Sequence, residues 1–319
     1  MRALVLGGTG WLGRAIVRDF VAAGVEVTCL ARGESGAVPE GARFVRADRL
    51  AADAYESVRG AWDEVIELSS EPELVEPALA ELADTAAHWT LVSTVSVYAR
   101  NDEPGADESA TLVEPTNLAE YADANVAAER SSTARLGARL LVARPGLIVG
   151  PGDPSDRFGY WPARLSSSGP TLIPKTAGRF VQVIDVADLA AWLSRAARGG
   201  YVGVANAVGD VIPMSTFFER VSAVTNFDGA FEEVEDEVLL AHDVRYWAGP
   251  RSLPLWLPLS DAAMAQRSAR IFQQMTGRVR PLESTVADVL EDERFRGLGR
   301  SRRSGLSAAE ESSVLQDVL

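Results

Sequence analysis

The sequence contains very little of three residue types: its 319 residues include one cysteine, one lysine and two histidines. Cys29 has no partner for an intrachain disulfide, and a reducing, cytoplasmic setting fits it best. His88 and His242 have no ligand partners at metal spacing, so we expect no metal site. Because Lys175 is the only lysine, nearly all positive side chains are arginines, which indicates a base-composition bias of the gene.

Long apolar runs are also missing. No apolar stretch approaches the roughly 18 residues that a membrane helix needs. The apolar run at the start of the chain is also too short for the hydrophobic region of a signal peptide. The formal net charge of −14 argues against a nucleic-acid or anionic membrane surface, because phosphate contacts need clustered Lys and Arg. We therefore expect a soluble protein that binds a small-molecule substrate, with no nucleic acid and no membrane as partner.

The first half of the chain alternates short β-rich apolar runs with longer helical patterns. This alternation predicts a parallel sheet with helices on both faces. The strand-like runs are ALVLGG, VEVTCLA, RFVRAD, DEVIELSS, HWTLVSTV and RLLVARPGLIVG, and the helical patterns cover 11–23, 72–87 and 118–137.

After Gly150 the pattern becomes dense in proline, glycine and aromatic residues, which is typical of a loop-rich substrate cap. We predict an α/β fold with a Rossmann-type doubly wound parallel sheet and a smaller, mainly helical C-terminal substrate domain. The dinucleotide-binding domain is expected to comprise 1–150 and 179–211, and the cap and C-terminal helices 151–178 and 212–319.

Two features are expected near the end of the chain. The arginine-rich stretch RFRGLGRSRR, at 294–303, is interpreted as a solvated, mobile linker. Ser307 and Glu310 have the spacing of a capping box and predict the start of a last helix.

A glycine loop follows the first strand. In LVLGGTGWLGRAIV, Gly7, Gly10 and Gly13 stand between a strand and a helix, where they allow a tight turn and a close approach of the backbone to a pyrophosphate. The predicted cofactor site also includes Thr9, Trp11 and Leu12.

The end of the second strand bears on the choice of cofactor. A chain selective for NAD usually has Asp or Glu here, whereas this one has Ala31 and Arg32. Since an arginine can hold a 2′-phosphate, NADP(H) is favoured over NAD(H). Arg14 could assist, or it could be a solvated first-turn residue. Asp48 is placed to meet the adenine, with a helix cap as the alternative.

Taken in order, these motifs resemble the extended short-chain dehydrogenase/reductase family, which contains nucleotide-sugar epimerases, dehydratases and related reductases. The resemblance covers roughly residues 1 to 211. The motifs are GGTGWLG, DEVIELSS, LVSTVSVYA, YADAN, RPGLIVGPGD and VQVIDVADLA.

The resemblance implies a catalytic set. Thr94, four places before Tyr98, matches the hydroxyl residue that bonds the substrate oxygen, and Tyr121 matches the tyrosine that exchanges a proton with it. Asn125 stands where the family has lysine. The resemblance also implies a homodimer through the helices near 78–87 and 118–137.

Further cofactor contacts follow from the same resemblance. Leu68, Ser69 and Ser70 should line the cofactor after the fourth strand, and Pro145 should lie near the nicotinamide amide. Glu67 replaces a more usual histidine.

The change at position 125 has a physical meaning. Free tyrosine has a pKa near 10, and an ammonium group nearby would favour the phenolate. Asparagine can donate a hydrogen bond but adds no charge. Reduction of a carbonyl is least affected, because a neutral tyrosine is ready to donate a proton. Lys175 could supply charge from another direction, or be an exposed loop lysine.

The sequence therefore favours an enzyme, an NADP(H)-dependent oxidoreductase that reduces a carbonyl of a small or medium molecule. Tyr121 would donate the proton and Thr94 would orient the oxygen. Substrate contacts are expected from Arg157, Tyr160 and Trp161, unless these pack the cap. Three alternatives stay open: a catalytically weak or inactive NAD(P)-binding sensor or scaffold, a nucleotide-sugar epimerase or dehydratase, and an RNA-binding relative of the fold.

Overall fold

The computed structural model describes residues 1–318, which divide into two units. The first unit comprises Met1–Ile148, Val186–Gly209 and Arg267–Val279. The second comprises Val149–Asp185, Asp210–Gln266 and the chain from Arg280 onwards. The predicted division placed 267–279 with the C-terminal part, whereas the structure places this segment in the first unit.

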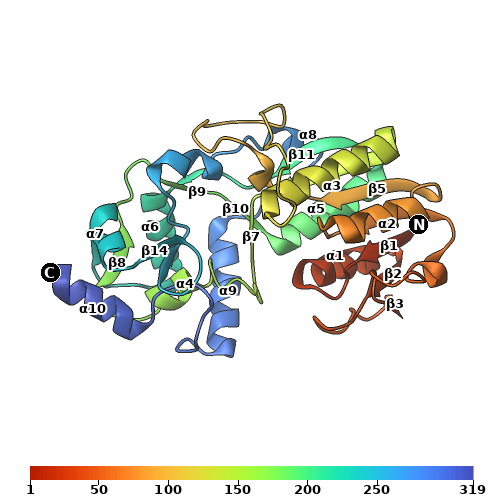
Figure 1. Ribbon diagram of the computed structural model, residues 1–319. Coiled ribbons are helices and arrows are strands. Elements are labelled where there is room, and N and C mark those ends of the chain that lie inside the picture. The colour runs from red at the N-terminus through yellow and green to blue at the C-terminus, as the bar shows by residue number, and fades with distance from the viewer. Residues whose placement is uncertain (319) are drawn as a thin grey trace. The chain divides into compact units, whose positions relative to one another are not determined.

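A seven-stranded sheet forms the centre of the first unit, with the strand order β11-β6-β5-β4-β1-β2-β3 and every neighbouring pair parallel (Figure 1). The order reverses between β1 and β4, which is where doubly wound sheets bind ligands at the carboxyl ends of their strands. The predicted fold class is confirmed. The strands are β1 (Arg2–Leu6), β2 (Glu26–Ala31), β3 (Arg43–Arg46), β4 (Trp62–Glu67), β5 (Ala86–Val92), β6 (Leu140–Pro145) and β11 (Gly203–Ala207).

Helices pack on both faces of this sheet, α1 against α5 and α2 against α3. A short helix, α8, packs beside β11. There Trp192 donates to the carbonyl of Met275 (3.0 Å) and meets the ring of Phe272. The helical elements are α1 (Trp11–Ala22), α2 (Pro72–Leu82), α3 (Tyr121–Leu136), α5 (Val186–Gly199), α8 (Arg270–Gln274), η1 (Glu56–Val58), η2 (Val95–Val97) and η3 (Gly137–Arg139).

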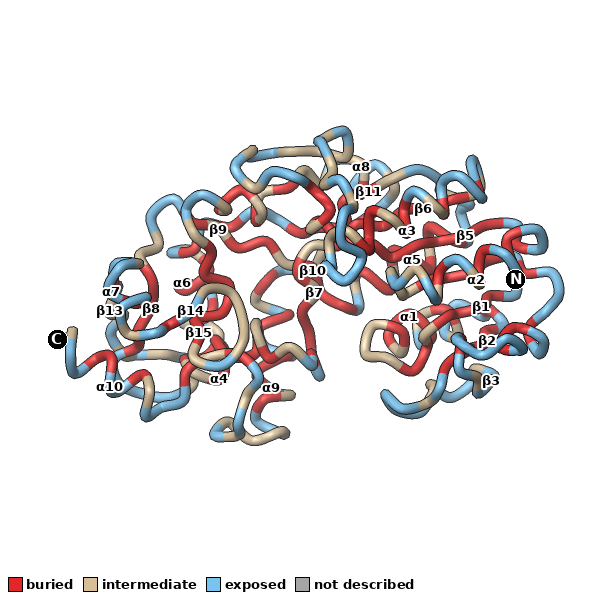
Figure 2. The backbone as a smooth tube through the Cα atoms, in the orientation of Figure 1, coloured by how far each residue is buried: buried red, intermediate tan, exposed pale blue. Residues whose placement is uncertain are grey.

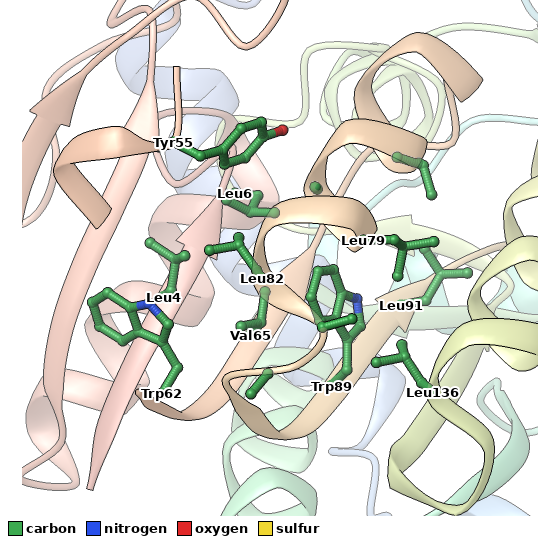
Figure 3. Packing of buried hydrophobic residues seen from close by; sticks show 14 of the residues in the cluster. Leu4, Leu6, Tyr55, Trp62, Val65, Leu79, Leu82, Trp89, Leu91 and Leu136 are labelled. Atoms are coloured by element: carbon green, nitrogen blue, oxygen red, sulfur yellow. The ribbon is translucent and has the colours of Figure 1, made fainter. Parts of the chain in front are cut away.

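The core under α2 and α3 follows from the side-chain alternation of the strands. Leu4 and Leu6 of β1 point to the same face, as the period of two requires, and join Val65, Trp89 and Leu91 from β4 and β5 (Figure 3). The edge strand β3 is largely exposed, whereas β1, β2, β4, β5 and β6 are buried along nearly their whole length (Figure 2). The apolar runs of these buried strands are therefore nearly continuous, as is usual for parallel strands.

The second unit is built from short helices and three pairs of short strands, β12 with β9, β13 with β8 and β14 with β15. The strand pairs add to the mainly helical pattern that the sequence predicts. The helical elements are α4 (Tyr160–Leu165), α6 (Met214–Thr225), α7 (Asp236–Ala241), η4 (Leu259–Ala265), α9 (Leu282–Arg296) and α10 (Ala308–Val318). The strands are β8 (Thr171–Pro174), β9 (Phe180–Val181), β10 (Val183–Asp185), β12 (Ile212–Pro213), β13 (Phe231–Val234), β14 (Arg245–Trp247) and β15 (Ser252–Pro254), while β7 (Leu147–Val149) spans the junction of the units.

The C-terminal part corrects one expectation and confirms another. The segment 294–303 is no solvated, mobile linker, because Arg300 and Arg302 are ion-paired with the buried Glu293 at 2.7 and 2.6 Å. The capping box is present: the amide of Ser307 donates to Glu310, and the amide of Glu310 donates to the Ser307 hydroxyl. Within residues 1–318, no helix has both the length and the apolar character needed to cross a bilayer.

Candidate active site

The glycine loop connects β1 to α1 in a conformation that depends on glycine. Gly7 has a positive φ of 101°, which L side chains rarely adopt. A Cβ on Gly13 would lie 2.5 Å from the Gly7 carbonyl oxygen, and one on Gly8 would lie 2.6 Å from the sulfur of Cys29. Gly10 caps α1 without a side-chain hydrogen bond. The amides at the start of α1 thus have no side-chain cap from residue 10, an arrangement that suits a pyrophosphate.

Arg14 joins this loop to the loop after β2. Its Nη1 donates to the carbonyl oxygens of Thr9 (2.6 Å) and Ser35 (2.7 Å). The alternative of a solvated Arg14 therefore does not hold. Arg32 is exposed, with its Nε 3.3 Å from Glu34. Arg32 thus belongs to the loop after β2, and Arg14, in the first turn of α1, is bonded to this loop and to the glycine loop.

Asp48 follows β3 with an exposed side chain. Its Oδ1 accepts a hydrogen bond from the amide of Leu50 (3.1 Å), an arrangement that stabilises the turn. The second carboxylate oxygen is the group that could meet an adenine.

Glu67 ends β4 and is completely buried. Arg49 donates to both of its carboxylate oxygens, at 2.9 and 2.5 Å, and to the phenol oxygen of Tyr55. The amide of Ser69 also donates to Glu67 (2.9 Å). The residue that replaces the usual histidine therefore organises the backbone of the segment predicted to line the cofactor.

The same segment lies against the glycine loop. A Cβ on Gly7 would be 3.6 Å from the Cβ of Leu68, an ordinary van der Waals contact. Leu68, Ser69 and Ser70 are partly exposed beyond the carboxyl end of β4. The structure thus brings the first and fourth strand ends together, as the cofactor prediction requires. Pro145, at the end of β6, is buried and pairs with Ala207 of β11.

Thr94 and Tyr121 lie on elements that pack together, η2 and α3. Thr94 follows β5 and caps η2: its hydroxyl accepts from the amide of Ser96 (3.1 Å) and is 3.2 Å from the Ser96 hydroxyl. Tyr121 is the first residue of α3 and is 61% exposed. The Tyr121 side chain is therefore exposed to solvent, whereas Thr94 is buried.

Asp123 fixes the chain that enters α3. Its carboxylate accepts from the amides of Asn117 (2.8 Å) and Thr116 (2.7 Å), and these bonds lower the pKa of Asp123. The first turn of the helix, which carries Tyr121, is held in place by this loop.

Asn125 is turned away from solvent. It is 2% exposed, and its Nδ2 donates to the backbone carbonyl of Tyr121 (2.8 Å). The only lysine, Lys175, lies in the second unit, 3.9 and 3.8 Å from the carboxylates of Glu233 and Glu235. Its ammonium thus has carboxylate partners of its own.

A buried network beside these residues escaped the sequence analysis. Glu129, one turn after Asn125, accepts from Arg144 Nε (2.9 Å) and Nη2 (2.6 Å) and from the Ser93 hydroxyl (2.5 Å). The signal was present in the sequence, because Arg144 is a charged residue inside an otherwise apolar strand. This network ties α3 to the ends of β5 and β6.

The network continues to Tyr98. Arg144 Nη1 donates to the Tyr98 hydroxyl (3.0 Å), which in turn donates to Oδ1 of Asn206 on β11 (2.6 Å). The guanidinium groups of Arg144 and Arg267 lie 5.1 and 4.6 Å from the Tyr98 ring centre. The residues around Thr94 are therefore held by a rigid, charged core.

Comparison with known proteins agrees with this arrangement. The model of the NAD dependent epimerase/dehydratase family matches residues 3–207. The chain belongs to this family. The 2′-dehydrokanamycin reductase of Streptomyces kanamyceticus is 27% identical over 310 residues, covering 89% of this chain and 83% of the relative. The Epimerase family protein SDR39U1 of Homo sapiens is 27% identical over 242 residues, covering 65% of this chain and 74% of the relative.

Solved structures share the fold at lower identity. A UDP-glucose 4-epimerase from Thermus thermophilus has a TM-score of 0.64 at 18% identity, with 93% of this chain and 99% of that chain covered. A UDP-glucuronic acid 4-epimerase from Bacillus cereus has a TM-score of 0.66 at 14% identity, with the same coverage. At this level the likeness concerns the fold alone.

Membership of the epimerase/dehydratase family makes NAD(P) the expected cofactor, and the glycine-capped start of α1 fits it. No group of three or more His, Cys, Asp or Glu side chains within residues 1–318 could hold a metal ion.

The three predicted substrate residues of this family member lie in the second unit. Tyr160 and Trp161 are buried, and Trp161 donates to the carbonyl of Pro254 (2.8 Å) while packing edge-on against Phe218. This arrangement is the one expected if Tyr160 and Trp161 pack the cap, which was the alternative to substrate contact. Arg157 is partly exposed, with its guanidinium 5.2 Å from the ring centre of Trp247.

Proposed function

We propose that this protein is an NADP(H)-dependent reductase of a carbonyl group on a small or medium molecule. Tyr121 donates the proton and Thr94 orients the carbonyl oxygen. The observation that carries the proposal is the pairing of an exposed Tyr121 with a buried Asn125 whose Nδ2 donates to the backbone carbonyl of Tyr121. No ammonium group stands at position 125 to favour a phenolate.

The direction of the reaction follows from the absence of a positive charge at position 125. When bound, the dinucleotide would supply the hydride. As negative charge develops on the carbonyl oxygen, a neutral phenol at the start of α3 donates its proton to that oxygen. The Thr94 hydroxyl can donate a second hydrogen bond to the same oxygen if it leaves Ser96. Proton removal, which epimerases and dehydratases need, would require a phenolate and is less favoured.

The cofactor preference rests on Arg32 and Arg14. Arg32 is paired with the exposed Glu34, and an exposed ion pair of this kind contributes little to stability, so a phosphate can replace Glu34. Arg14 already holds the glycine loop and the loop after β2 together. One guanidinium group on the loop after β2 and a second that is bonded to that loop suit the additional phosphate of NADP(H).

The reductase among the relatives also supports reduction, and not proton removal, as the reaction of this protein. It is named for the reduction of 2′-dehydrokanamycin and is similar over 89% of this chain. A carbonyl compound is therefore the first class of substrate to test.

A second candidate is an NAD(P)-binding protein with little or no turnover. Asn125 also favours this second candidate. The position that carries a charged lysine in the family is here occupied by a buried, uncharged side chain. The two candidates agree on cofactor binding and differ in turnover.

The test is NADPH oxidation by the natural protein with a panel of aldehydes and of acyclic and cyclic ketones. We expect consumption of at least one substrate, and a loss of about 100-fold or more in kcat for Tyr121→Phe with an unchanged NADPH dissociation constant. Tyr201→Phe, at a partly exposed tyrosine of the same unit, is the matched control. Equal activity of Tyr121→Phe would refute the assigned role, and NADPH binding without turnover would favour the second candidate.

A further inference from the structure

Two of the segments expected to contact the dinucleotide follow strands that are not neighbours in the sheet. Asp48 follows β3, and Leu68, Ser69 and Ser70 follow β4. Because β1 and β2 lie between β3 and β4, strand pairing does not place the two segments side by side. A direct connection between them therefore has to come from side chains.

The buried pair of Arg49 and Glu67 makes this connection. Arg49 is the residue after Asp48, and Glu67 is the residue before Leu68. Their side chains are 8% and 0% exposed. Two parallel hydrogen bonds, Nη1 to Oε1 (2.9 Å) and Nη2 to Oε2 (2.5 Å), join the guanidinium to the carboxylate. A bidentate pair of this kind fixes the relative direction of its two partners as well as their distance.

Both partners also hold the backbone of the chain that follows β4. The carboxylate of Glu67 accepts from the amide of Ser69 (2.9 Å), and Arg49 Nη2 donates to the carbonyl of Leu74 (2.8 Å) in the first turn of α2. Between these points, the Ser69 hydroxyl accepts from the amide of Glu71 (3.2 Å). The segment between β4 and α2 is therefore held by the pair at both of its ends.

The same pair fixes the turn that carries Asp48. Arg49 Nε donates to the hydroxyl of Tyr55 (3.0 Å), which is 3% exposed and belongs to the core under α2 and α3 (Figure 3). Asp48 Oδ1 accepts from the amide of Leu50 (3.1 Å). Arg49 thus anchors a turn whose exposed carboxylate is the group that could meet an adenine.

A buried ion pair is a poor source of net stability. Removing two charges from water is costly, and apolar side chains of similar volume are often at least as stabilising. The hydrogen bonds of Arg49 and Glu67 lie within the protein, so the pair does not itself offer a ligand a binding group. What it supplies is a fixed geometry between two partly exposed segments.

We propose that the Arg49–Glu67 pair is a positioning device for the dinucleotide, which couples the Asp48 carboxylate at the adenine to the segment 68–70 beside the glycine loop. Neither partner touches the cofactor, and each acts through the residue next to it in the chain. The inference rests on the cofactor site of the proposed function but not on the proposed reduction of a carbonyl.

The experiment is a double-mutant cycle on NADPH binding, measured by fluorescence titration of the full chain. One change is Arg49→Met/Glu67→Leu, which removes the pair and fills its volume with apolar side chains. The other is Asp48→Asn, which keeps an acceptor for the Leu50 amide but replaces the second oxygen with a nitrogen that cannot accept a hydrogen bond.

The cycle distinguishes positioning from a structural role. In the natural background, Asp48→Asn should raise the NADPH dissociation constant about ten-fold. In the pair-free background it should raise it less than about two-fold, because the carboxylate no longer lies where it meets the adenine. If the pair only stabilised the fold, the loss would be the same in both backgrounds.

Glu64→Gln is the matched control, an isosteric change at an equally buried carboxylate of β4 that pairs with His88. It should leave the ten-fold effect of Asp48→Asn intact. Glu67→Gln, which keeps the shape of the side chain and removes its charge, replaces the double variant as background if circular dichroism shows that the latter does not fold.

Equal losses in the natural and pair-free backgrounds, or no loss in the natural background, overturn the inference. Absence of NADPH binding by the natural protein overturns it together with the cofactor assignment. A natural protein that shows the expected binding pattern but reduces no carbonyl refutes the proposed reaction and leaves the inference standing.

Discussion

The side-chain amide of Asn125 donates a 2.8 Å hydrogen bond to the backbone carbonyl of Tyr121, one helical turn earlier in α3. The side chain of Asn125, at the position where the family has lysine, is therefore hydrogen-bonded within the helix and buried. It carries no charge. The tyrosine is left exposed at the start of the helix, with no positive charge from position 125. The chemistry proposed for this protein depends on that relationship.

Arg32 should determine the choice between the two dinucleotides. We expect Arg32→Gln to weaken NADPH binding about ten-fold, because a charge-assisted bond to the 2′-phosphate is lost, and to change NADH binding less than about two-fold. Fluorescence titration with both cofactors measures this. Arg59→Gln, at an exposed arginine paired with Glu81, is the charge-matched control. An equal loss for NADPH and NADH would show that Arg32 does not contact the 2′-phosphate.

The Glu129–Arg144 pair should dominate the stability of the site. Glu129→Gln leaves a buried guanidinium without its carboxylate and should lower the free energy of unfolding by about 3–5 kcal/mol. The control is Glu114→Gln, which breaks the exposed pair with Arg130 on the same helix and should cost less than about 1 kcal/mol. Urea denaturation measures both. Similar losses in the two variants would contradict the assigned importance of the buried pair.

Stability should also fall at alkaline pH because of His88. Its Nδ1 meets Glu64 and its Nε2 meets the carbonyl of Tyr201. Burial opposes the charged imidazole, but the hydrogen bond and the charge of Glu64 outweigh it and raise the pKa of His88. Burial also raises the pKa of Glu64, which acts in the same direction.

The sign of this effect follows from proton linkage. A raised folded-state pKa stabilises the protein fully below the unfolded value, about 6.5 for histidine, and the stabilisation is lost as the pH rises through the folded value. Urea unfolding from about pH 6 to about pH 9 should show this decline, and the double variant Glu64→Gln/His88→Asn should flatten it. The substitution His242→Asn should leave the slope unchanged. If stability still declines with pH in the double variant, other titratable groups cause the decline.

Local patterns in the sequence predicted the strands β1 to β6 of the sheet but not β11, whose short run from Gly203 to Ala207 was not among the predicted strands. Each strand of a parallel sheet is buried on both faces and reads as an apolar run, and the glycine loop has its own steric signature at Gly7 and Gly13. The ends of β1 and β4 meet as predicted, because the strand order of a doubly wound sheet brings them together.

Features that depend on tertiary pairing were not predictable. Nothing local to Glu129 or Arg144 indicates that the two meet, and the return of 267–279 to the first unit depends on contacts made by Trp192 and Phe272. The arginine-rich stretch 294–303 has the composition of a solvated segment. It is ordered because Glu293 and Asp156, far apart in the sequence, pair with its guanidinium groups.

The most direct test of the central claim compares NADPH oxidation by the natural protein and by Asn125→Lys on one panel of aldehydes and ketones. The account predicts that the natural protein turns over at least one carbonyl substrate, with a kcat within about ten-fold of the lysine variant, because a neutral tyrosine suffices for proton donation. Turnover by the lysine variant alone would contradict it and would show that the natural protein binds its cofactor without acting as a reductase.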